Sequence, residues 1–395
     1  MRLGIDASNI RDGGGITYLS ELLSAAQPFM YDFTRVTVWA GAQTLARLPQ
    51  RPWLQLAHVP TLDRSLPARL YWQHTKLPRL AEQHCDVLFV PGGNSRDSFR
   101  PYVTMSQNLL PFESQELFRY GASGLTAKFL LLREAQSKSF GRADGVIFLS
   151  NYARTVVSQA AGLKGDAPVI PHGISRQFYL PPRHPRSLSD CSPAYPFRLL
   201  YVSRIEPYKH QWQVVEAVAQ LHQRGYPVSL DLIGPGTNAA AVRRLQAALA
   251  DADPRGEFIR YREEIPYAKL ATYYHRADAF IFASSCENLP NILLEAMAAS
   301  LPIACAYRGP MPEVLNDAGV YFDPEKPADI ANALASLIEN ATLRGQCSWT
   351  AYGYAKGYSW ERCARETFSY LTKVAHRMRQ SVAVEPALTG SFSHR

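Results

Sequence analysis

The sequence contains few cysteines and no long apolar run. Its six cysteines form no CxxC pair and no regular spacing, a pattern that predicts reduced thiols, no disulfide and no zinc site. No window approaches the roughly 18 consecutive apolar residues that a membrane-spanning helix needs. The first residues, "MRLGIDASNIRDGGG", lack the apolar stretch of a secretion signal, so the sequence predicts a cytoplasmic protein.

The charge is positive and unevenly distributed. The formal net charge is +8, and residues 1–180 carry 19 Lys and Arg against 13 Asp and Glu. A basic half favours an anionic partner such as a nucleotide, a phosphorylated lipid or an anionic membrane surface, although an ordinary basic surface is an equal alternative. No basic run is interleaved with aromatic residues as in nucleic-acid-binding proteins. Nucleic acid is therefore not an expected partner.

Short apolar runs alternate with longer stretches of helical periodicity along almost the whole chain. Strands are predicted in two series: 2–7, 35–40, 53–59, 86–90, 102–106, 145–150 and 167–171, then 197–203, 228–234, 257–263, 278–284, 301–307 and 319–323. The helices predicted between and after them include 16–26, 68–84, 210–225, 238–251 and 290–300. This alternation is typical of parallel sheets covered by helices on both faces.

The predicted fold is therefore α/β, with two doubly wound, Rossmann-like parallel-sheet domains facing a central cleft. A length of 395 residues fits two domains of ordinary size. The predicted segments are a first domain at 1–180, a Pro- and Ser-rich linker at 181–196, a second domain at 197–360, a helix at 361–378 and a polar tail at 379–395. Ligands of such domains bind at the carboxyl ends of the strands, where the strand order reverses.

Three glycines, Gly13–Gly15, stand where the first predicted strand gives way to a helix. They permit positive φ and close approach of the backbone, and the unpaired amides of the following helix can bind an anion. The alternative is a flexible surface turn. The pattern is neither GxGxxG nor a P-loop.

Two cations follow the first strand of the second series. Arg204 and Lys209 lie five residues apart in "SRIEPYKHQ", which precedes a helix predicted to begin near His210. The planar guanidinium and the compact ammonium can together bind a diphosphate. The alternative is a solvated loop that carries two charges.

The stretch "SSCENLPNILLEAMAASLP" contains two glutamates, Glu287 and Glu295, with seven residues between them. Pro290 suits the first turn of a helix, so Glu287 is expected before this helix and Glu295 inside it. A carboxylate can accept hydrogen bonds from two vicinal hydroxyls at once, as in ribose binding. The alternative, two surface glutamates, is weakened by the apolar residues around Glu295.

In this order the motifs resemble those of the GT-B glycosyltransferases, and "ENLPNILLE" resembles the E-x7-E signature of their retaining family 4 (glycosyl transferases group 1). The resemblance covers almost the whole chain. Its segments are Gly13–Gly15, "FLSNYART", "VIPHGIS", "SRIEPYKH", "PEVLNDAGVYFDP" and "YSWERCARETFSYL".

The resemblance implies a nucleotide diphosphate-sugar donor, with the first domain on the acceptor side and the second binding the donor. Arg204 and Lys209 would stabilise the departing diphosphate without a metal or other cofactor, and Glu287 would hold the transferred sugar. Retention would need no protein nucleophile, and the final helix would cross back to the first domain. The other implied donor-binding residues are Gly14, Gly15, Gly234, Asn288, Leu289 and Glu295.

Two features depart from simple expectation. Where many relatives carry a histidine, this chain has Gln107 and Asn108, which can hydrogen-bond an acceptor but cannot act as a general base. The "DAD" at 251–253 matches the metal-binding DxD of another glycosyltransferase class, but its position after an Ala-rich helix favours a solvated loop. His172 is interpreted as a turn residue.

The leading hypothesis is a retaining hexosyltransferase that moves a hexose or deoxyhexose onto a growing glycan. That glycan is expected to be lipid-linked, in O-antigen, lipopolysaccharide or exopolysaccharide synthesis. A peripheral position of the enzyme on the inner face of the cell membrane is a further expectation. One alternative is a soluble enzyme of the same fold that makes a small glycoside. Another is a non-catalytic subunit of a polysaccharide-assembly complex.

Overall fold

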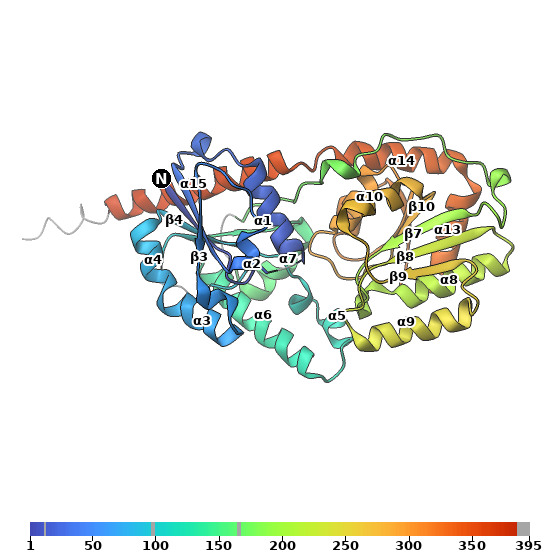
Figure 1. Cartoon of the computed structure of the whole chain (residues 1–395), viewed down its shortest axis with the longest axis horizontal. Coiled ribbons are helices and arrows are strands. Elements are labelled where there is room, and N and C mark those ends of the chain that lie inside the picture. Colours follow the sequence, from blue (N-terminus) through green and yellow to red (C-terminus); the bar gives the residue numbers. More distant parts are fainter. Residues whose placement is uncertain (12, 96–98, 164–166, 385–395) are drawn as a thin grey trace, which may run out of the picture. The chain divides into compact units, whose positions relative to one another are not determined.

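The computed structural model describes residues 1–11, 13–95, 99–163 and 167–384, which form two units (Figure 1). Unit 1 contains 1–108, 130–173 and the chain from 360 onward, and unit 2 contains 109–129 and 174–359. The segment 109–129 thus belongs to unit 2, although it lies inside the predicted first domain. Within the described part of the chain, no helix combines the length and hydrophobicity needed to cross a bilayer. The end of the predicted tail, 385–395, lies outside the described residues.

Unit 1 is built on a six-stranded parallel sheet with the order β3-β2-β1-β4-β5-β6. Its strands are β1 (Arg2–Asp6), β2 (Arg35–Ala40), β3 (Leu54–His58), β4 (Val87–Val90), β5 (Tyr102–Met105) and β6 (Gly145–Ile147). The predicted strand at 167–171 is wrong, because this segment forms only an isolated bridge between Val169 and Phe148. The strand order reverses between β1 and β4.

The helices of unit 1 follow the predicted pattern with small differences. The predicted helix 68–84 is two helices, α3 (Leu66–Thr75) and α4 (Leu77–His84), because Pro78 lacks the amide needed to continue α3. The others are α1 (Gly13–Ala25), α2 (Ala42–Leu45), α7 (Asn151–Ala161) and α15 (Trp360–Val384), while α6 (Gly124–Arg142) runs from the unit 2 segment into unit 1.

The final helix, α15, belongs to unit 1 and packs against α1 and β4. It is longer than predicted, so the polar tail expected from 379 is helical as far as Val384. Apolar residues such as Phe368, Leu371 and Val374 are almost completely buried, and this amphipathic face explains the docking of the helix.

Unit 2 has a second six-stranded parallel sheet with the order β12-β11-β10-β7-β8-β9. All six predicted strands are confirmed: β7 (Phe197–Val202), β8 (Val228–Ile233), β9 (Ile259–Arg262), β10 (Ala279–Phe282), β11 (Ile303–Ala306) and β12 (Gly319–Phe322). The central strand β10 is buried along its whole length, as expected for a strand covered on both faces.

The longer helices of unit 2 pack in layers on this sheet. Helices α8 (Gln211–Gln223), α9 (Ala239–Ala252) and α13 (Pro327–Glu339) lie together on one side, and α10 (Tyr267–Arg276) lies on the other (Figure 1). The remaining helices are α5 (Ser114–Phe118), α11 (Asn291–Ala298), α12 (Met311–Leu315) and α14 (Ala341–Ala355).

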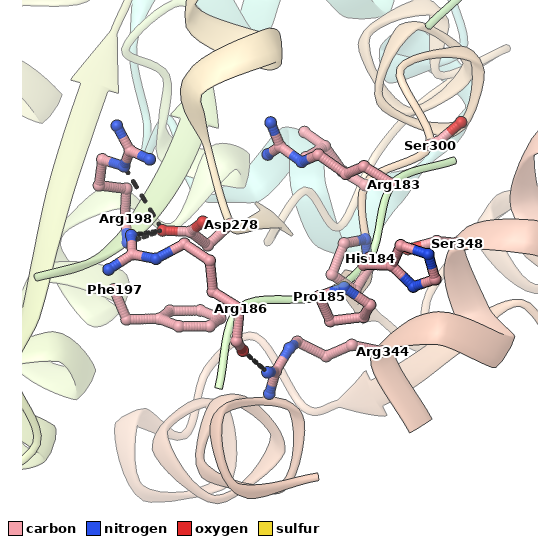
Figure 2. Close-up of a pocket in the computed structure, with 12 residues that line it drawn as sticks. Arg183, His184, Pro185, Arg186, Phe197, Arg198, Asp278, Ser300, Arg344 and Ser348 are labelled. Carbon is pink, nitrogen blue, oxygen red and sulfur yellow. Dashed lines mark hydrogen bonds and ion pairs between the residues drawn. The ribbon is translucent and has the colours of Figure 1, made fainter. Parts of the chain in front are cut away.

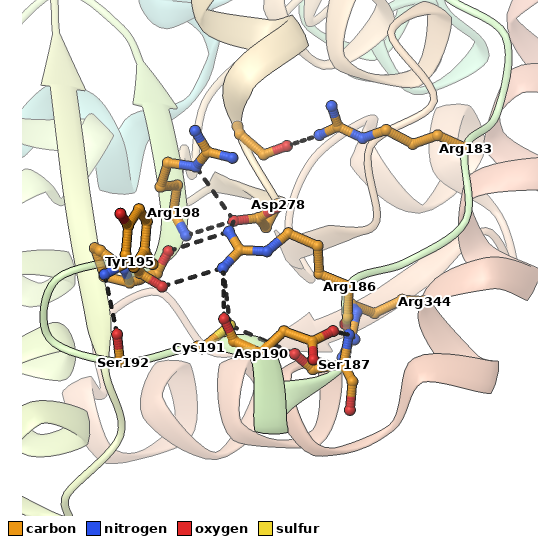
Figure 3. Close-up of polar contacts among 12 residues, drawn as sticks. Arg183, Arg186, Ser187, Asp190, Cys191, Ser192, Tyr195, Arg198, Asp278 and Arg344 are labelled. Atoms are coloured by element: carbon orange, nitrogen blue, oxygen red, sulfur yellow. Dashed lines mark hydrogen bonds and ion pairs between the residues drawn. The ribbon is translucent and has the colours of Figure 1, made fainter.

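The predicted linker, 181–196, is attached to unit 2 by arginines near the amino ends of β7 and β10. Arg186 donates to Asp278 at 3.1 Å and to the carbonyl oxygen of Tyr195 at 3.1 Å, and Arg198 also contacts Asp278 (Figure 3). Arg183 donates to the carbonyl oxygens of residues 275 and 277. Buried Arg344 donates to three further carbonyl oxygens, including that of Arg186. We refer to these four arginines and Asp278 as the arginine cluster.

The arginine cluster borders a cavity of about 150 Å³ (Figure 2). All five residues of the arginine cluster line the cavity. Phe197 and Pro302, which lie at or next to the starts of strands, also line it. No predicted site residue lines it. Since ligands of doubly wound domains bind at the carboxyl ends of the strands, this cavity is at the opposite edge from the one expected to bind substrate.

Candidate functional site

The strand order of unit 2 brings two of the predicted catalytic residues together. Neighbouring strands β7 and β10 mark the point where the order reverses, and the loops after them diverge to opposite faces of the sheet. Lys209 follows β7 and Glu287 follows β10, and the ammonium Nζ donates to Oε1 of Glu287. Both side chains are largely withdrawn from solvent, with exposed fractions of 9% for Lys209 and 16% for Glu287.

The loop that carries Lys209 has a definite conformation. Residues Pro207–Lys209 form a single 3-10 turn, and His210 takes a left-handed conformation before α8 begins at Gln211. The predicted helix start near His210 is therefore close to the observed one. The Lys209 carbonyl accepts a hydrogen bond from the Tyr201 hydroxyl at 2.6 Å, which fixes the backbone beneath the ammonium.

Glu287 precedes α11 and Glu295 lies within it, as predicted. Pro290 is the residue just before the helix rather than part of its first turn. Asn288 and Leu289, which the resemblance assigns to the donor, are both buried. The apolar character of α11 is explained by its position in the core of unit 2.

Glu295 is almost completely buried and is held by two tyrosines of α10. Tyr274 donates to one carboxylate oxygen at 3.0 Å and Tyr267 to the other at 3.2 Å. Burial raises the pKa of Glu295 to about 7, while the two hydroxyls oppose this shift. The carboxyl group can therefore change its protonation state near neutral pH.

Arg204 and Gly234 lie beside each other at the carboxyl ends of β7 and β8. Gly234 has φ +148°, and a Cβ atom there would come within 2.0 Å of the carbonyl oxygen of Ser203. Only glycine allows this close approach of the two loops. The Arg204 side chain is exposed, so a cation is presented to solvent beside the Gly234 backbone.

The predicted site residues of unit 1 follow β1 and β5, the two strands that flank β4 in the sheet. The three glycines form the first turn of α1, and Gly13 has φ +61°. A Cβ atom on Gly15 would contact the Gln107 amide oxygen at 3.4 Å, whereas one on Gly14 would meet nothing. Asn108 is exposed. The glycine turn and Gln107 are therefore neighbours in this unit.

The interpretations of His172 as a turn residue and of the DAD stretch as a solvated loop can be compared with the structure. His172 is buried between the rings of Tyr18 and Trp360, with centroids 4.8 and 5.6 Å away, which is a packing role. Asp253 accepts hydrogen bonds from the backbone amides of 257, 258 and 259. It therefore stabilises the loop before β9, although it is buried rather than solvated as predicted.

Sequence reasoning missed the residues that hold the predicted ones in place. Tyr274 reaches Glu295 from a different helix, and Ser285 connects the loops of Lys209 and Glu287. A tyrosine on α10 five residues before the next strand carries no local signal of this role. Ser285 lies inside the glutamate motif, and its position next to a buried strand end was the one available signal.

The comparisons with known proteins concern the family and the fold of the chain. Residues 192–354 match the family model of Glycosyl transferases group 1, a range that includes Arg204, Lys209, Gly234, Glu287 and Glu295. D-inositol 3-phosphate glycosyltransferase of Arthrobacter sp. is 27% identical over 202 residues, which are 50% of this chain and 48% of that protein. O-antigen chain mannosyltransferase B of Escherichia coli is 24% identical over 245 residues, 60% of this chain and 63% of that protein. The chain thus spans about half to two thirds of the length of these relatives.

Solved structures match nearly the whole chain. Sucrose-phosphate synthase of Thermosynechococcus elongatus has a TM-score of 0.73 at 17% identity, covering 97% of this chain and 99% of that one. Anabaena HepE in complex with UDP-glucose has a TM-score of 0.70 at 18% identity, covering 96% and 100%. The fold of this chain is therefore the two-unit α/β fold of the GT-B glycosyltransferases, and its residues 192–354 match the Glycosyl transferases group 1 family.

Proposed function

We propose that this protein is a retaining glycosyltransferase that moves a hexose or deoxyhexose from a nucleotide diphosphate-sugar to a growing, lipid-linked glycan. The observation that carries the proposal is the Lys209–Glu287 pair at the carboxyl edge of unit 2, next to exposed Arg204 and within the matched family segment. Support for the donor class comes from the GT-B fold and from HepE, which binds UDP-glucose.

In the proposed donor complex, each charged group has a separate role. Lys209 and Arg204 bind the diphosphate and stabilise the negative charge that develops as it leaves. Glu287 accepts hydrogen bonds from hydroxyls of the transferred sugar, and Glu295 interacts with the ribose. Because Lys209 is shielded from solvent, its ammonium acts on the diphosphate more strongly than it would in water. No side chain is assigned as a nucleophile, and no metal is assigned.

Two observations support a lipid-linked glycan as the acceptor. The similar mannosyltransferase of Escherichia coli acts on an O-antigen chain according to its name, and the first 180 residues of this chain are basic. Gln107 and Asn108 are assigned to the acceptor, where their amides can hydrogen-bond sugar hydroxyls. A basic surface would also favour an anionic membrane that carries a lipid-linked acceptor.

Nucleotide release tests the donor and the reaction. Purified protein is incubated with GDP-, UDP-, ADP- and dTDP-sugars, with and without a bacterial lipid extract. We expect lipid-stimulated release from one donor, reduced at least about 100-fold in Glu287→Ala. The matched control, Glu257→Ala, removes an exposed carboxylate and should keep full activity.

The other outcomes separate the alternatives. Nucleotide release that requires only a simple sugar as acceptor, and no lipid extract, would indicate a soluble enzyme making a small glycoside. If no donor sugar releases its nucleotide and none raises the melting temperature of the protein, the proposal is overturned in favour of a non-catalytic subunit. The anomeric configuration of the product, determined by NMR, tests retention separately from the identity of the donor.

A further inference from the structure

The segment 109–129 supplies unit 2 with a short helix whose polar side chains reach the candidate site. Glu116 of α5 is buried, and its Oε2 atom accepts a hydrogen bond from the Ser285 hydroxyl at 2.7 Å. Tyr120, which follows α5, donates to Glu206 at 2.8 Å. The segment therefore contacts both the loop after β7 and the loop after β10.

Ser285 joins these two loops. Its backbone amide donates to the Tyr208 carbonyl at 2.9 Å, and its hydroxyl lies 2.8 Å from Nε2 of His210. Tyr208 and His210 flank Lys209 in sequence, and Ser285 is two residues before Glu287. The position of Ser285 thus sets how the lysine and the glutamate face each other.

The direction of each hydrogen bond between Glu116, Ser285 and His210 follows from the donors available. The Ser285 hydroxyl has one proton, and the Glu116 carboxylate at 2.7 Å is a better acceptor for it than the Tyr208 carbonyl oxygen at 3.2 Å. The hydroxyl oxygen must then accept from Nε2–H of His210, which makes His210 the neutral Nε2–H tautomer. Consistent with this, Nδ1 of His210 has no hydrogen-bond partner among the described residues.

His210 adopts the left-handed conformation, which few residues other than glycine take. It has φ +52° and is completely buried, a combination that is strained for a residue with a Cβ atom. Strained residues of this kind are found preferentially at functional sites, where the surroundings hold them in place. Here the hydrogen bond to Ser285 is the contact that holds the imidazole.

We propose that Glu116 is a positioning residue of the donor site, which through Ser285 and His210 holds Lys209 and Glu287 in the geometry needed to bind the diphosphate and the sugar. The inference rests on the proposed function of this site. Glu116 itself touches neither Lys209 nor Glu287, so it acts through the two residues between them.

Arg119 completes the arrangement and offers a matched control. It donates to Glu116 at 2.6 Å and to Glu325 at 2.6 Å. Glu116→Gln removes the charge that Ser285 and Arg119 share. Glu325→Gln makes the same chemical change at the other partner of Arg119 and leaves Ser285 untouched. A difference between the two variants therefore reports the link to Ser285 and not the ion pair of Arg119.

The experiment measures nucleotide release by wild type, Glu116→Gln, Glu325→Gln, Ser285→Ala and Ser285→Thr. We expect kcat to fall about tenfold in Glu116→Gln and Ser285→Ala, with KM for the donor within about threefold of wild type. Ser285→Thr keeps a hydroxyl and should recover most of the activity. Thermal melts establish that each variant is folded at the assay temperature.

The outcomes distinguish this inference from the proposed function. Equal activity of Glu116→Gln and Glu325→Gln would overturn the positioning role and leave the glycosyltransferase proposal standing. A threonine variant as inactive as the alanine variant would also overturn it, because the hydroxyl would then not be what matters. A wild type that releases no nucleotide from any donor would overturn both.

Discussion

The two edges of the sheet in unit 2 use charged residues in opposite ways. At the amino edge, Arg186 and Arg198 of the arginine cluster share the carboxylate of Asp278 (Figure 3). The other two arginines of the cluster donate to backbone carbonyl oxygens. At the carboxyl edge, Lys209 and Glu287 form a single ion pair, Arg204 is exposed, and His210 is strained. Charges with several fixed partners stabilise a fold, whereas charges with few partners remain able to bind a ligand. We therefore expect the amino edge to stabilise the fold and the carboxyl edge to bind the proposed donor.

Replacing Arg186 by alanine should break the structural edge and give the largest effect on stability. Asp278, whose side chain is 7% exposed, would lose one of its two guanidinium partners, and linker carbonyl oxygens would lose theirs. We expect the free energy of unfolding to fall by about 3 kcal/mol, measured by urea denaturation. Nucleotide release per folded molecule should stay within about twofold of wild type.

The control for this variant is Arg255→Ala, because Arg255 is 84% exposed and, among the described residues, forms an ion pair only with a surface glutamate. Such pairs contribute little, so stability should be unchanged. A loss of activity in Arg186→Ala without a loss of stability would contradict the assignment of this edge to structure.

At the carboxyl edge, Glu295 should make stability depend on pH. Its pKa is raised by burial to about 7 from 4.5, so between these values the unfolded chain is ionised while the folded one keeps its proton. The stability that this group contributes is present below pH 4.5 and is lost as the pH rises through 7. The total change is on the order of 3 kcal/mol.

Urea denaturation of wild type and Glu295→Gln at pH 5, 6 and 7 measures this effect. The glutamine cannot ionise, so the stability of wild type relative to the variant should decrease steadily over this range. If the difference in free energy of unfolding between the two proteins is the same at all three pH values, burial does not raise the pKa of Glu295, and this prediction is wrong.

Local sequence patterns were sufficient to predict the strands of unit 2. They failed for the predicted strand at 167–171 of unit 1. Runs such as "AFIF" are apolar at every position because both faces of the central strand are covered. The run at 167–171 has the same local character, yet it forms only one bridge. Strand pairing there depends on neighbours that the local sequence does not specify.

The sequence was sufficient to predict individual residues of the candidate site, but it was not sufficient to predict the contacts between them. Arg204, Lys209, Glu287 and Glu295 follow from motif and strand position. The pairing of Lys209 with Glu287 depends on the neighbourhood of β7 and β10, which is set by strand order. Glu116 lies 169 residues from Ser285 in sequence, so no spacing rule could connect them. The roles of these residues in sugar transfer stay predictions until nucleotide release is measured.

His210 should give the smallest effect, with a sign opposite to that of Glu295. Its pKa is lowered to about 4 from 6.5, first by burial and then by the nearby Arg119. Other charges that act on it are those of Arg308, Asp323 and Glu325. Between pH 4 and 6.5 the unfolded chain gains a proton that the folded one does not, so stability falls on acidification.

His210→Asn removes this titration while keeping a residue type that tolerates positive φ. From pH 6.5 to 5, wild type should lose about 2 kcal/mol relative to the variant, measured by urea denaturation. NMR of the imidazole nitrogens should show neutral His210 at pH 5. Between pH 4.5 and 6.5 the slopes from Glu295 and His210 have opposite signs, so each offsets part of the other in wild type. A single substitution at either residue should therefore reveal a pH dependence that the intact carboxyl edge partly conceals, and parallel slopes in the two variants would contradict this account.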